Sequence, residues 1–569
     1  MTGSLLIPPA AALIVGGFLL PLLRGPLRAA MLLLAPLLTL YLVWQVPDGV
    51  VVQAPFLGAD LALVKGDALS RLFATVFALA AFGGGLYALN QSRIVELAAA
   101  FIYAGSAIGV VFAGDLITVF IFWEFMAVAS ALVIVSAGEG AYGAGLRYAA
   151  IHFFGGVLLM AGIAGEAVTT GQIAFQAMTL DSWPRLLMLA GFLINAGAWP
   201  LSAWIADAYP RASWSGMVFL SAFTTKTAVY VLLRGFPGTE LLIVLGLVMV
   251  FYGIVCAILE SDMRRLLAYS IVSQVGFMVT AIGIGTPLAL NGAAAHAFAH
   301  ILYKALLLMA AGSVLNATGK SNLRDLGGLA RAMPLTCVCA IVGALSISAF
   351  PLTSGFVSKA MIAQAAGEAH LALVWFLLTA ASALTPFYAG FIFIWFTFFG
   401  APGAGGEPRL AEAPLADPPW NMKLAMALMA LACVALGVFP GALYAMLPYP
   451  VDFVPYTASH VVFQLHLTLA AAVVFVLLFR WLKRTATVTL DVDWLWRGLG
   501  LSLTRWADAW AGLAWTSLVQ ALRGATGRAV GAVVRTHGAR SVMARTWSTG
   551  AMAFWMTLIF AAYLIFAYL

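Results

Sequence analysis

The sequence predicts an all-α polytopic membrane protein with about sixteen transmembrane helices. The chain has 569 residues, of which 63% are hydrophobic and only 9% are charged, whereas soluble globular proteins carry about 25% charged residues. Its mean hydropathy is +1.01. Apolar runs long enough to cross a bilayer recur along the chain, without the ~10-residue alternating segments of barrel strands. These observations exclude disordered chains, disulfide scaffolds and ordinary soluble enzymes.

Each candidate span is an apolar run between short polar connections. The first run starts with Met-Thr-Gly-Ser and has no basic segment before it, so we expect a retained helix and not a cleaved signal. The spans begin near residues 5, 28, 68, 96, 115, 146, 185, 213, 239, 264, 288, 332, 370, 421, 459 and 547.

The placement of basic residues predicts the orientation of the chain. Up to the fifteenth span, twelve Lys and Arg residues fall in the odd-numbered connections and four fall in the even-numbered ones. Basic loops remain on the cytoplasmic side. We therefore expect a multi-pass protein of the bacterial inner (cytoplasmic) membrane with both termini outside.

Residues 486–546 have a different composition from the rest of the chain. They are rich in Trp and Arg and are too polar to span a membrane. This pattern predicts an amphipathic lateral segment that lies along the membrane or along a partner. A basic loop bound to anionic lipid is the alternative.

The four cysteines all lie in apolar runs. Cys337-Val-Cys339 lacks the two-residue gap of redox and metal-binding pairs. We expect all four to be small core residues, and we expect neither a bound metal nor a cofactor.

Several charged residues lie inside predicted spans. Lys226, Lys304 and Lys359 are there, together with Glu124 in the middle of the fifth span and Glu166 near the end of the sixth. A charge at bilayer depth is costly, and it usually marks an ion or proton path. Ion or proton translocation is therefore the first hypothesis.

One span carries two histidines and a lysine at helical spacing. His296, His300 and Lys304 are four residues apart, which places them in one stripe on one helix face. Imidazole titrates near neutral pH, so this stripe is suited to proton transfer. A haem or metal site and two buried, hydrogen-bonded histidines without a transport role are the alternatives.

Two spans contain proline in their middle. Trp199-Pro200-Leu201-Ser202 interrupts the seventh span, just after Asn195, and Phe350 to Gly355 interrupts the twelfth, just before Lys359. Broken helices line the path in many transporters. A simple packing kink is the alternative at either place.

These motifs together resemble the antiporter-like subunits shared by respiratory complex I, Mrp-type cation/proton antiporters and membrane-bound hydrogenases. Within this family, the chain resembles the D-type subunits of Mrp and the large antiporter-like subunits of complex I. The resemblance covers roughly residues 60–400. The segments that carry it are Asp115-Leu-Ile-Thr-Val-Phe-Ile-Phe-Trp-Glu124, Trp204-Ile-Ala-Asp207-Ala-Tyr-Pro210, Thr225-Lys226, Asp262-Met-Arg264-Arg265-Leu-Leu-Ala-Tyr-Ser, His296 to Lys304 with Ala-Leu-Leu after it, and Ser354-Gly-Phe-Val-Ser-Lys359.

The resemblance implies fourteen core helices, with two inverted five-helix repeats and broken helices 7 and 12. It also implies work within a multisubunit complex. The organisation that follows is N-terminal helices 1–3 at residues 1–95, a first repeat at 96–236, a second inverted repeat at 239–400, helices 14–15 at 421–485, the lateral segment at 486–546 and a C-terminal helix at 547–569.

The sequence departs from the family pattern on helix seven. The family carries a lysine where this chain has Asn195, and a histidine where this chain has Ser202. Asparagine cannot carry charge. The usual partner of Glu124 is therefore missing, which leaves Glu124 to pair elsewhere or to rest protonated.

The favoured function is a proton-translocating subunit of an Mrp-type cation/proton antiporter. Its relay would use Glu124, Lys226, His296, His300, Lys304 and Lys359, supported by Asp115, Asn195, Asp207, Arg264 and Arg265.

The expected partners are other membrane subunits, protons, Na⁺ or another monovalent cation, and lipids, but not nucleic acid. The sequence carries no catalytic or redox-cofactor motif of its own. The alternatives are a proton module coupled to a redox complex or to solute or inorganic carbon uptake, and a non-transporting scaffold.

Overall fold

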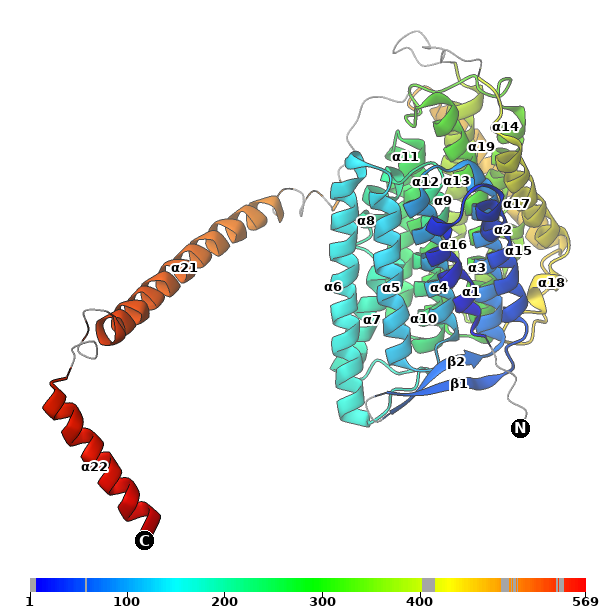
Figure 1. The fold of residues 1–569 in the computed structure, drawn as a ribbon. Helices are drawn as coiled ribbons and strands as arrows, with labels where there is room; N and C mark the ends of the chain where they lie inside the picture. The colour runs from blue at the N-terminus through cyan, green and yellow to red at the C-terminus, as the bar shows by residue number, and fades with distance from the viewer. Residues whose placement is uncertain are drawn as a thin grey trace. The chain divides into compact units, whose positions relative to one another are not determined.

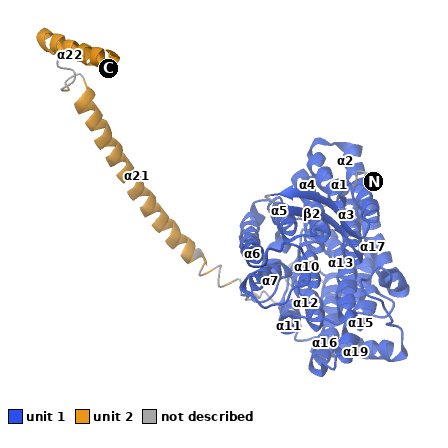
Figure 2. Ribbon diagram, turned by 90° about the horizontal axis from the view of Figure 1, so that it is seen from below, with its two compact units in different colours: residues 1–493 blue, residues 494–569 orange. Residues whose placement is uncertain are grey.

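The computed structural model describes residues 7–56, 59–401, 415–482, 491–492, 494, 498, 500–538, 541 and 547–568. The chain divides into two compact units, residues 1–493 and residues 494–569 (Figure 2). The larger unit is a bundle of helices that run roughly parallel to one axis, with a two-stranded sheet at one end (Figure 1).

The helices of the larger unit follow one another with short connections. They begin with α1 (Pro9–Leu19), the 3-10 turn η1 (Leu20–Leu22), α2 (Gly25–Val43), α3 (Ala68–Tyr87), η2 (Ala88–Asn90), α4 (Ile94–Phe112), α5 (Leu116–Val135), α6 (Glu139–Thr170), α7 (Trp183–Ala196), α8 (Ala203–Ala208), η3 (Tyr209–Arg211), α9 (Gly216–Ala222) and α10 (Thr224–Gly235). They continue with α11 (Leu241–Leu259), α12 (Met263–Ile284), α13 (Pro287–Thr318), α14 (Pro334–Ile347), α15 (Ser354–Glu368), α16 (Ala372–Thr385), the π-helical η4 (Pro386–Ile392) and η5 (Trp395–Phe399), α17 (Trp420–Val438), α18 (Gly441–Tyr444) and α19 (Ala458–Leu478).

The helices confirm the predicted polytopic architecture. Across both units, 13 helices in the described residues are long and apolar enough to cross a membrane. Three shorter apolar helices, Pro9–Leu22, Trp183–Ala196 and Pro334–Ile347, coincide with the remaining predicted spans.

Polar caps set several helix starts. Asp67 and Ser70 form a capping box at the start of α3, and Thr286 accepts the amide of Ala289 at the start of α13. Such side chains satisfy amide donors that have no partner within the helix. Helix ends use glycine, as at Gly171 after α6, where φ is +68° and a side chain would be strained.

The first half (residues 96–236) and the second half (residues 239–400) share a distinctive arrangement. In each, an aspartate caps one helix, α5 or α12, and the next helix, α6 or α13, has 32 residues and ends at a left-handed glycine. The same aspartate then forms a backbone bridge just beyond that glycine. The bridged pairs are Asp115 with Ala174 and Asp262 with Asn322.

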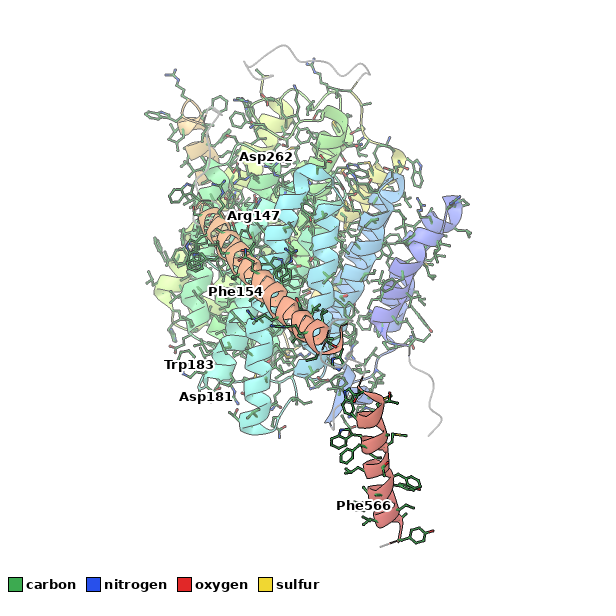
Figure 3. All side chains as sticks on the ribbon, turned by 60° about the vertical axis from the view of Figure 1, so that its left-hand side comes forward. Arg147, Phe154, Asp181, Trp183, Asp262 and Phe566 are labelled. Atoms are coloured by element: carbon green, nitrogen blue, oxygen red, sulfur yellow. The ribbon has the colours of Figure 1, made fainter. Side chains whose placement is uncertain are left out.

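The two arrangements point in opposite directions. Asp262 lies at one end of the bundle, whereas Asp181 and Trp183, which follow the α6 end and its bridge, lie at the other (Figure 3). Matched features of opposite direction support the predicted inverted repeats.

Helix interruptions occur at both predicted places. Residues 197–202 separate α7 from α8, and residues 348–353 separate α14 from α15. A third interruption, at Phe223 between α9 and α10, was not predicted. No proline or glycine marks it in the sequence.

A β-hairpin between α2 and α3 was also not predicted. Strands β1 (Gly49–Phe56) and β2 (Ala59–Gly66) pair antiparallel, with Val50 opposite Lys65. The β-branched run after Gly49 favours a strand. The Ala62 carbonyl accepts the amide of Gly114 at 2.9 Å, so the hairpin covers the bundle end where α5 begins.

Helix α13 is the centre of the larger unit. It contacts α3, α9, α10, α12, α14, α15 and α17. Most of its residues from Ala289 to Val314 are fully buried. The helix that carries the predicted stripe is therefore enclosed by protein and not by lipid.

The smaller unit holds two helices in its described residues, α21 (Leu501–His537) and α22 (Thr549–Tyr568). The polar segment predicted to be amphipathic forms the 37-residue helix α21. Trp506, Trp510 and Trp515 are more than half exposed on it. Within the predicted segment, residues 486–490, 493, 495–497, 499, 539–540 and 542–546 lie outside the described residues.

The close approach of α17 to the second interruption gives a stability prediction. A Cβ at Gly437 would lie 2.4 Å from the backbone of Leu352 and Thr353, which cannot move easily. We expect Gly437→Ala to lower the free energy of unfolding by about 1–3 kcal/mol. The measurement is the Tm of the purified complex.

Gly441→Ala is the matched control, since nothing lies within 4 Å of a Cβ at Gly441. Equal Tm values for the two variants would contradict the predicted crowding at Gly437.

Candidate functional site

The predicted stripe lies on α13 and is fully buried. His296, His300 and Lys304 each have 0% exposure. His296 Nδ1 lies 2.9 Å from the Ser358 hydroxyl on α15. Lys304 donates to the Ser270 hydroxyl and, at 3.4 Å, to the Leu267 carbonyl on α12. The stripe thus connects α12 to α15 through α13.

His300 lies between these two contacts, and neither of its ring nitrogens has a hydrogen-bond partner within the described residues. Its ring lies 6.3 Å from the His296 ring and 5.2 Å from the Tyr303 ring, measured between centroids. Buried polar groups are nearly always hydrogen-bonded, to protein or to water. The position of His300 is therefore suited to an ordered water between the two contacts of the stripe.

Lys359 lies on α15 and binds the main chain at the second helix interruption. Its Nζ donates to the Ile347 carbonyl at 2.9 Å, which is the last carbonyl of α14. The same Nζ lies 4.8 Å from the centroid of the Phe277 ring, a cation–π distance. The broken helix thereby supplies a partner for the buried charge.

Lys226 has the same relation to the third interruption. It is fully buried, and it donates to the Ser221 carbonyl at 2.6 Å and to the Thr225 hydroxyl at 3.1 Å. Ser221 belongs to α9 and Lys226 to α10. Both lysines thus bind carbonyls that an interrupted helix leaves without an intrahelical donor.

Two cavities that share lining residues extend outward from Lys359, and only the inner one contacts the lysine. The inner one has a volume of about 240 Å³ and is lined by Lys359, Gln364 and His460 among others. The outer one, of about 670 Å³, shares Gln364 and His460 with it and also contacts Glu368 and Asp452. Polar side chains therefore line a route from Lys359 toward the connection after α18.

Glu124 lies on the α6 side of α5, away from the stripe. Its side chain is half-buried, and its Oε1 atom is buried without a partner in the described chain. The carboxylate rests directly against Gly156 of α6, where a Cβ would lie 1.9 Å from Oε1. The neighbouring Phe125 is 55% exposed, so this helix face borders the lipid-facing surface.

Asn195, where the resembling family has a lysine, is fully buried at the end of α7. Neither its Oδ1 nor its Nδ2 has a partner among the described residues. A Cβ at Gly155 would lie 3.5 Å from Asn195 Oδ1. Glu124 and Asn195 therefore approach α6 at two adjacent glycines.

Four of the predicted supporting residues bind the backbone or pair with residues outside the predicted set, and they do not extend the stripe. Asp115 caps α5 and accepts from Thr118. Arg147 forms a two-point ion pair with Asp207, with a shortest distance of 2.7 Å. The other two are Arg264, which donates to the carbonyls of Pro210, Ala212 and Ser213, and Arg265, which pairs with Glu260 at 3.2 Å.

Glu166 is paired near the end of α6. Arg185 lies 2.8 Å from it and 3.0 Å from Asp181. The Thr179 hydroxyl and the Arg185 guanidinium hold the pKa of Asp181 below its usual range. This cluster stabilises the connection between α6 and α7. Glu166 is therefore not an unpaired carboxylate inside the bundle.

Sequence reasoning missed His152 on α6. The residue is fully buried, and its ring stacks on Tyr148 at 3.9 Å between centroids. A histidine inside an apolar span, one helical turn before Gly155 and Gly156, was the available signal in the sequence.

Within the described residues, no three His, Cys, Asp or Glu side chains gather in a way that could hold a metal ion. The four cysteines are buried and free. The three buried lysines and His296 contact hydroxyls and main-chain carbonyls. The chemistry that this arrangement offers is proton transfer between nitrogen and oxygen groups.

The chain resembles known proteins over most of its length. A family model described as NADH:quinone oxidoreductase/Mrp antiporter, transmembrane, matches residues 113–391. The D subunit of the Na(+)/H(+) antiporter of Alkalihalophilus pseudofirmus is 30% identical over 344 residues, which cover 57% of this chain and 68% of that protein.

The A/B subunit of a probable K(+)/H(+) antiporter of Rhizobium meliloti is 30% identical over 419 residues, which cover 68% of this chain but only 41% of that protein. The chain also spans only 59–66% of three further curated relatives.

The fold is that of a chain in the structure of the membrane-bound sulfane sulfur reductase, an archaeal respiratory membrane complex. The TM-score is 0.72 at 22% identity, and the match covers 98% of this chain and 99% of that one.

The contact between Glu124 and Gly156 gives a prediction about the carboxylate. In Gly156→Ala the new methyl group occupies the present position of Oε1, so the flexible side chain must turn away from α6 toward the lipid-facing side. We expect faster modification of Glu124 by a hydrophobic carbodiimide, measured by mass spectrometry of the labelled peptide. Gly143→Ala on the same helix is the control, because only the flexible Arg147 side chain lies near it. Unchanged labelling in Gly156→Ala would show that the carboxylate does not depend on this contact.

Proposed function

Because this chain belongs to the NADH:quinone oxidoreductase/Mrp antiporter family, we propose that it is a proton-translocating subunit of a multisubunit membrane complex. The complex we propose is an Mrp-type antiporter that exchanges Na⁺ or another monovalent cation for protons. The observation that carries this proposal is the buried series of Lys226, Lys304 and Lys359 at the centre of the bundle, of which Lys304 shares α13 with two buried histidines.

The partners of the three lysines suit proton exchange. Each lysine binds neutral oxygens, from hydroxyls or main-chain carbonyls. Among the ion pairs of the described residues, none joins one of these lysines to a carboxylate. An amine held only by neutral dipoles can release its proton without breaking an ion pair. Each lysine is therefore able to pass between its charged and neutral forms inside the bundle.

The proposed central step runs along α13. His300 and ordered water would pass a proton between Lys304 and His296. His296 contacts Ser358, and Lys359 is the next residue on α15. The step ends at Lys359, so the proton moves from the centre of the bundle to the second interruption.

The proposed outer step uses the inner cavity beside Lys359 and the outer cavity that follows it. His460 donates from Nδ1 to the Pro455 carbonyl at 3.2 Å, which leaves Nε2 as a proton acceptor. Since His460 and Gln364 line both cavities, they stand where a proton would leave the protein. Glu368 and Asp452 provide a negative rim at that mouth.

The proposal includes the membrane location, the orientation and the partners of the chain. We place it in the bacterial inner membrane with its N-terminus outside, as the basic connections predict. Its partners are other membrane subunits and lipids, which would cover exposed apolar helices such as α22, where Phe566 is 89% exposed (Figure 3).

A second candidate function is a proton module coupled to a redox complex. The family description covers NADH:quinone oxidoreductases as well as Mrp antiporters, and the same lysine series would serve both. In that case a partner protein would perform the electron transfer. A complex that moves protons on addition of a reductant, and not on addition of Na⁺ or K⁺, would favour this second function.

The lysine series gives a direct test. We expect Lys304→Ala and Lys359→Ala each to abolish cation-dependent proton movement, because each removes a proton carrier and leaves water or a hydroxyl in its place. Proton movement is followed with a pH-sensitive dye in membrane vesicles that contain the whole complex, after addition of Na⁺ or K⁺. Lys320→Ala, in the connection after α13, is the control and should retain the wild-type rate.

Assembly of each variant complex is checked by mass spectrometry of the purified material. Full proton movement in both lysine variants would refute the relay. A wild-type complex without proton movement under any drive would instead support the scaffold alternative.

A further inference from the structure

The first half holds a group of buried polar atoms that no described residue satisfies. They are Glu124 Oε1 on α5, His152 Nε2 on α6, both amide atoms of Asn195 on α7, and Ser202 Oγ just before α8. A native protein rarely leaves such atoms without a partner. Their concentration on four consecutive elements indicates a polar, hydrated space within the first half.

Three of these groups meet at one place on α6. Glu124 Oε1 lies against Gly156, and Asn195 Oδ1 lies beside Gly155. His152 is one helical turn before Gly156 on the same helix, a rise of about 6 Å. Trp204 closes this place from α8, because its indole donates to the Ile194 carbonyl at 3.0 Å and its ring lies 4.5 Å from the His152 ring.

The hydrogen bonding of His152 determines which of its nitrogens can react. Nδ1 lies 2.9 Å from the Tyr148 carbonyl. A carbonyl can only accept, so Nδ1 carries the hydrogen of the neutral ring and Nε2 carries the lone pair. The stacked Tyr148 ring and the Trp204 edge fix the imidazole plane. Nε2 is therefore a positioned proton acceptor without a partner in the described part of the protein.

Hydroxyl groups near His152 extend from Tyr148, whose ring stacks on the imidazole, toward the turn that holds Lys226. The Tyr148 hydroxyl donates to Ser130 at 2.8 Å and lies 3.3 Å from the Thr224 hydroxyl. Thr224 begins α10, and the next residue, Thr225, accepts from Lys226. The polar space around His152 thus borders the turn that holds Lys226.

We propose that His152 is the proton-carrying group of the first half, accepting at Nε2 the proton that Glu124 releases and passing it on toward Lys226, with Asn195 orienting the water between them. This inference rests on the proposed proton translocation. In the first step the O–H bond of protonated Glu124 breaks and an N–H bond forms at Nε2, which gives a carboxylate beside an imidazolium. In the second step the imidazolium returns that proton to water, and the neutral amine of Lys226 takes it up. No electron transfer is involved.

Asn195 has a different part in this scheme. Its amide can donate and accept hydrogen bonds at once but does not titrate. It can therefore hold a water beside Gly155 without competing for the proton. The charge that helix seven lacks is supplied transiently by His152, one helix away.

The test combines a loss with a rescue. In the whole complex in vesicles, we expect His152→Gln to slow cation-dependent proton movement about tenfold or more, a typical contribution of a positioned acid–base group. We expect His152→Gln combined with Asn195→Lys to recover much of the rate, because an amine at position 195 would lie against the same stretch of α6. A packing role of His152 would not be restored by a lysine on another helix. His466→Gln, the same substitution at an exposed site on α19, is the matched control.

The inference is overturned by a wild-type rate in His152→Gln, or by a loss that Asn195→Lys does not restore. These outcomes are separable from a failure of the proposed function. If the wild-type complex moves protons and Lys304→Ala does not, only the part assigned to His152 is refuted. If the wild-type complex moves no protons at all, the function itself is refuted, and the inference falls with it.

Discussion

The structure depends on a constraint that lipid imposes on the main chain: every carbonyl and amide at membrane depth must find a partner inside the protein. An interrupted helix violates this constraint unless a donor is supplied. Lys226 and Lys359 supply it, since each donates to a carbonyl freed by an interruption. The dependence is mutual, because the same carbonyls solvate ammonium groups that bilayer lipid would exclude. The enclosed position of α13, between both lysines, follows from the need to keep lipid away from these breaks.

The two halves meet this constraint with different side chains. In the second half, Gln464 of α19 donates to the Ser348 carbonyl at 3.1 Å, and the hydroxyl of Tyr456 accepts the Leu352 amide at 3.2 Å. The first interruption is closed mainly by Trp204, while polar atoms of Asn195 and Ser202 remain without protein partners in the described chain. Since both halves share the same helix order and capping, the difference lies in side chains and not in architecture. At the second interruption too, the hydroxyls of Ser348 and Ser354 lack a partner in the described chain, so both interruptions offer sites for ordered water.

Much of this organisation could be predicted from the sequence. Apolar runs located the spans, proline marked two interruptions, and the four-residue spacing on α13 placed His296, His300 and Lys304 on one buried face. The hairpin at residues 49–66 was missed although the β-branched run after Gly49 and the glycine at position 58 were available signals. The break at Phe223 could not be predicted, because no proline or glycine marks it. The position of Glu124 against α6 could not be predicted from the sequence either. It depends on which face of α5 packs against which helix, and a helix that is apolar on all sides gives no sequence signal for that packing.

The placement of the acid–base groups around α6 explains how a half with an uncharged residue on helix seven can keep its polar path. A lysine at position 195 would place an amine beside Gly155, and its charged form would attract the Glu124 carboxylate. Asn195 leaves the carboxylate free of such an attraction, and the two glycines of α6 let both side chains approach the helix backbone. A histidine one turn away can then alternate between neutral and charged forms. With Asn195 in this place, the titrating group that we propose for the first half is the imidazole of His152 on α6 and not an amine on α7.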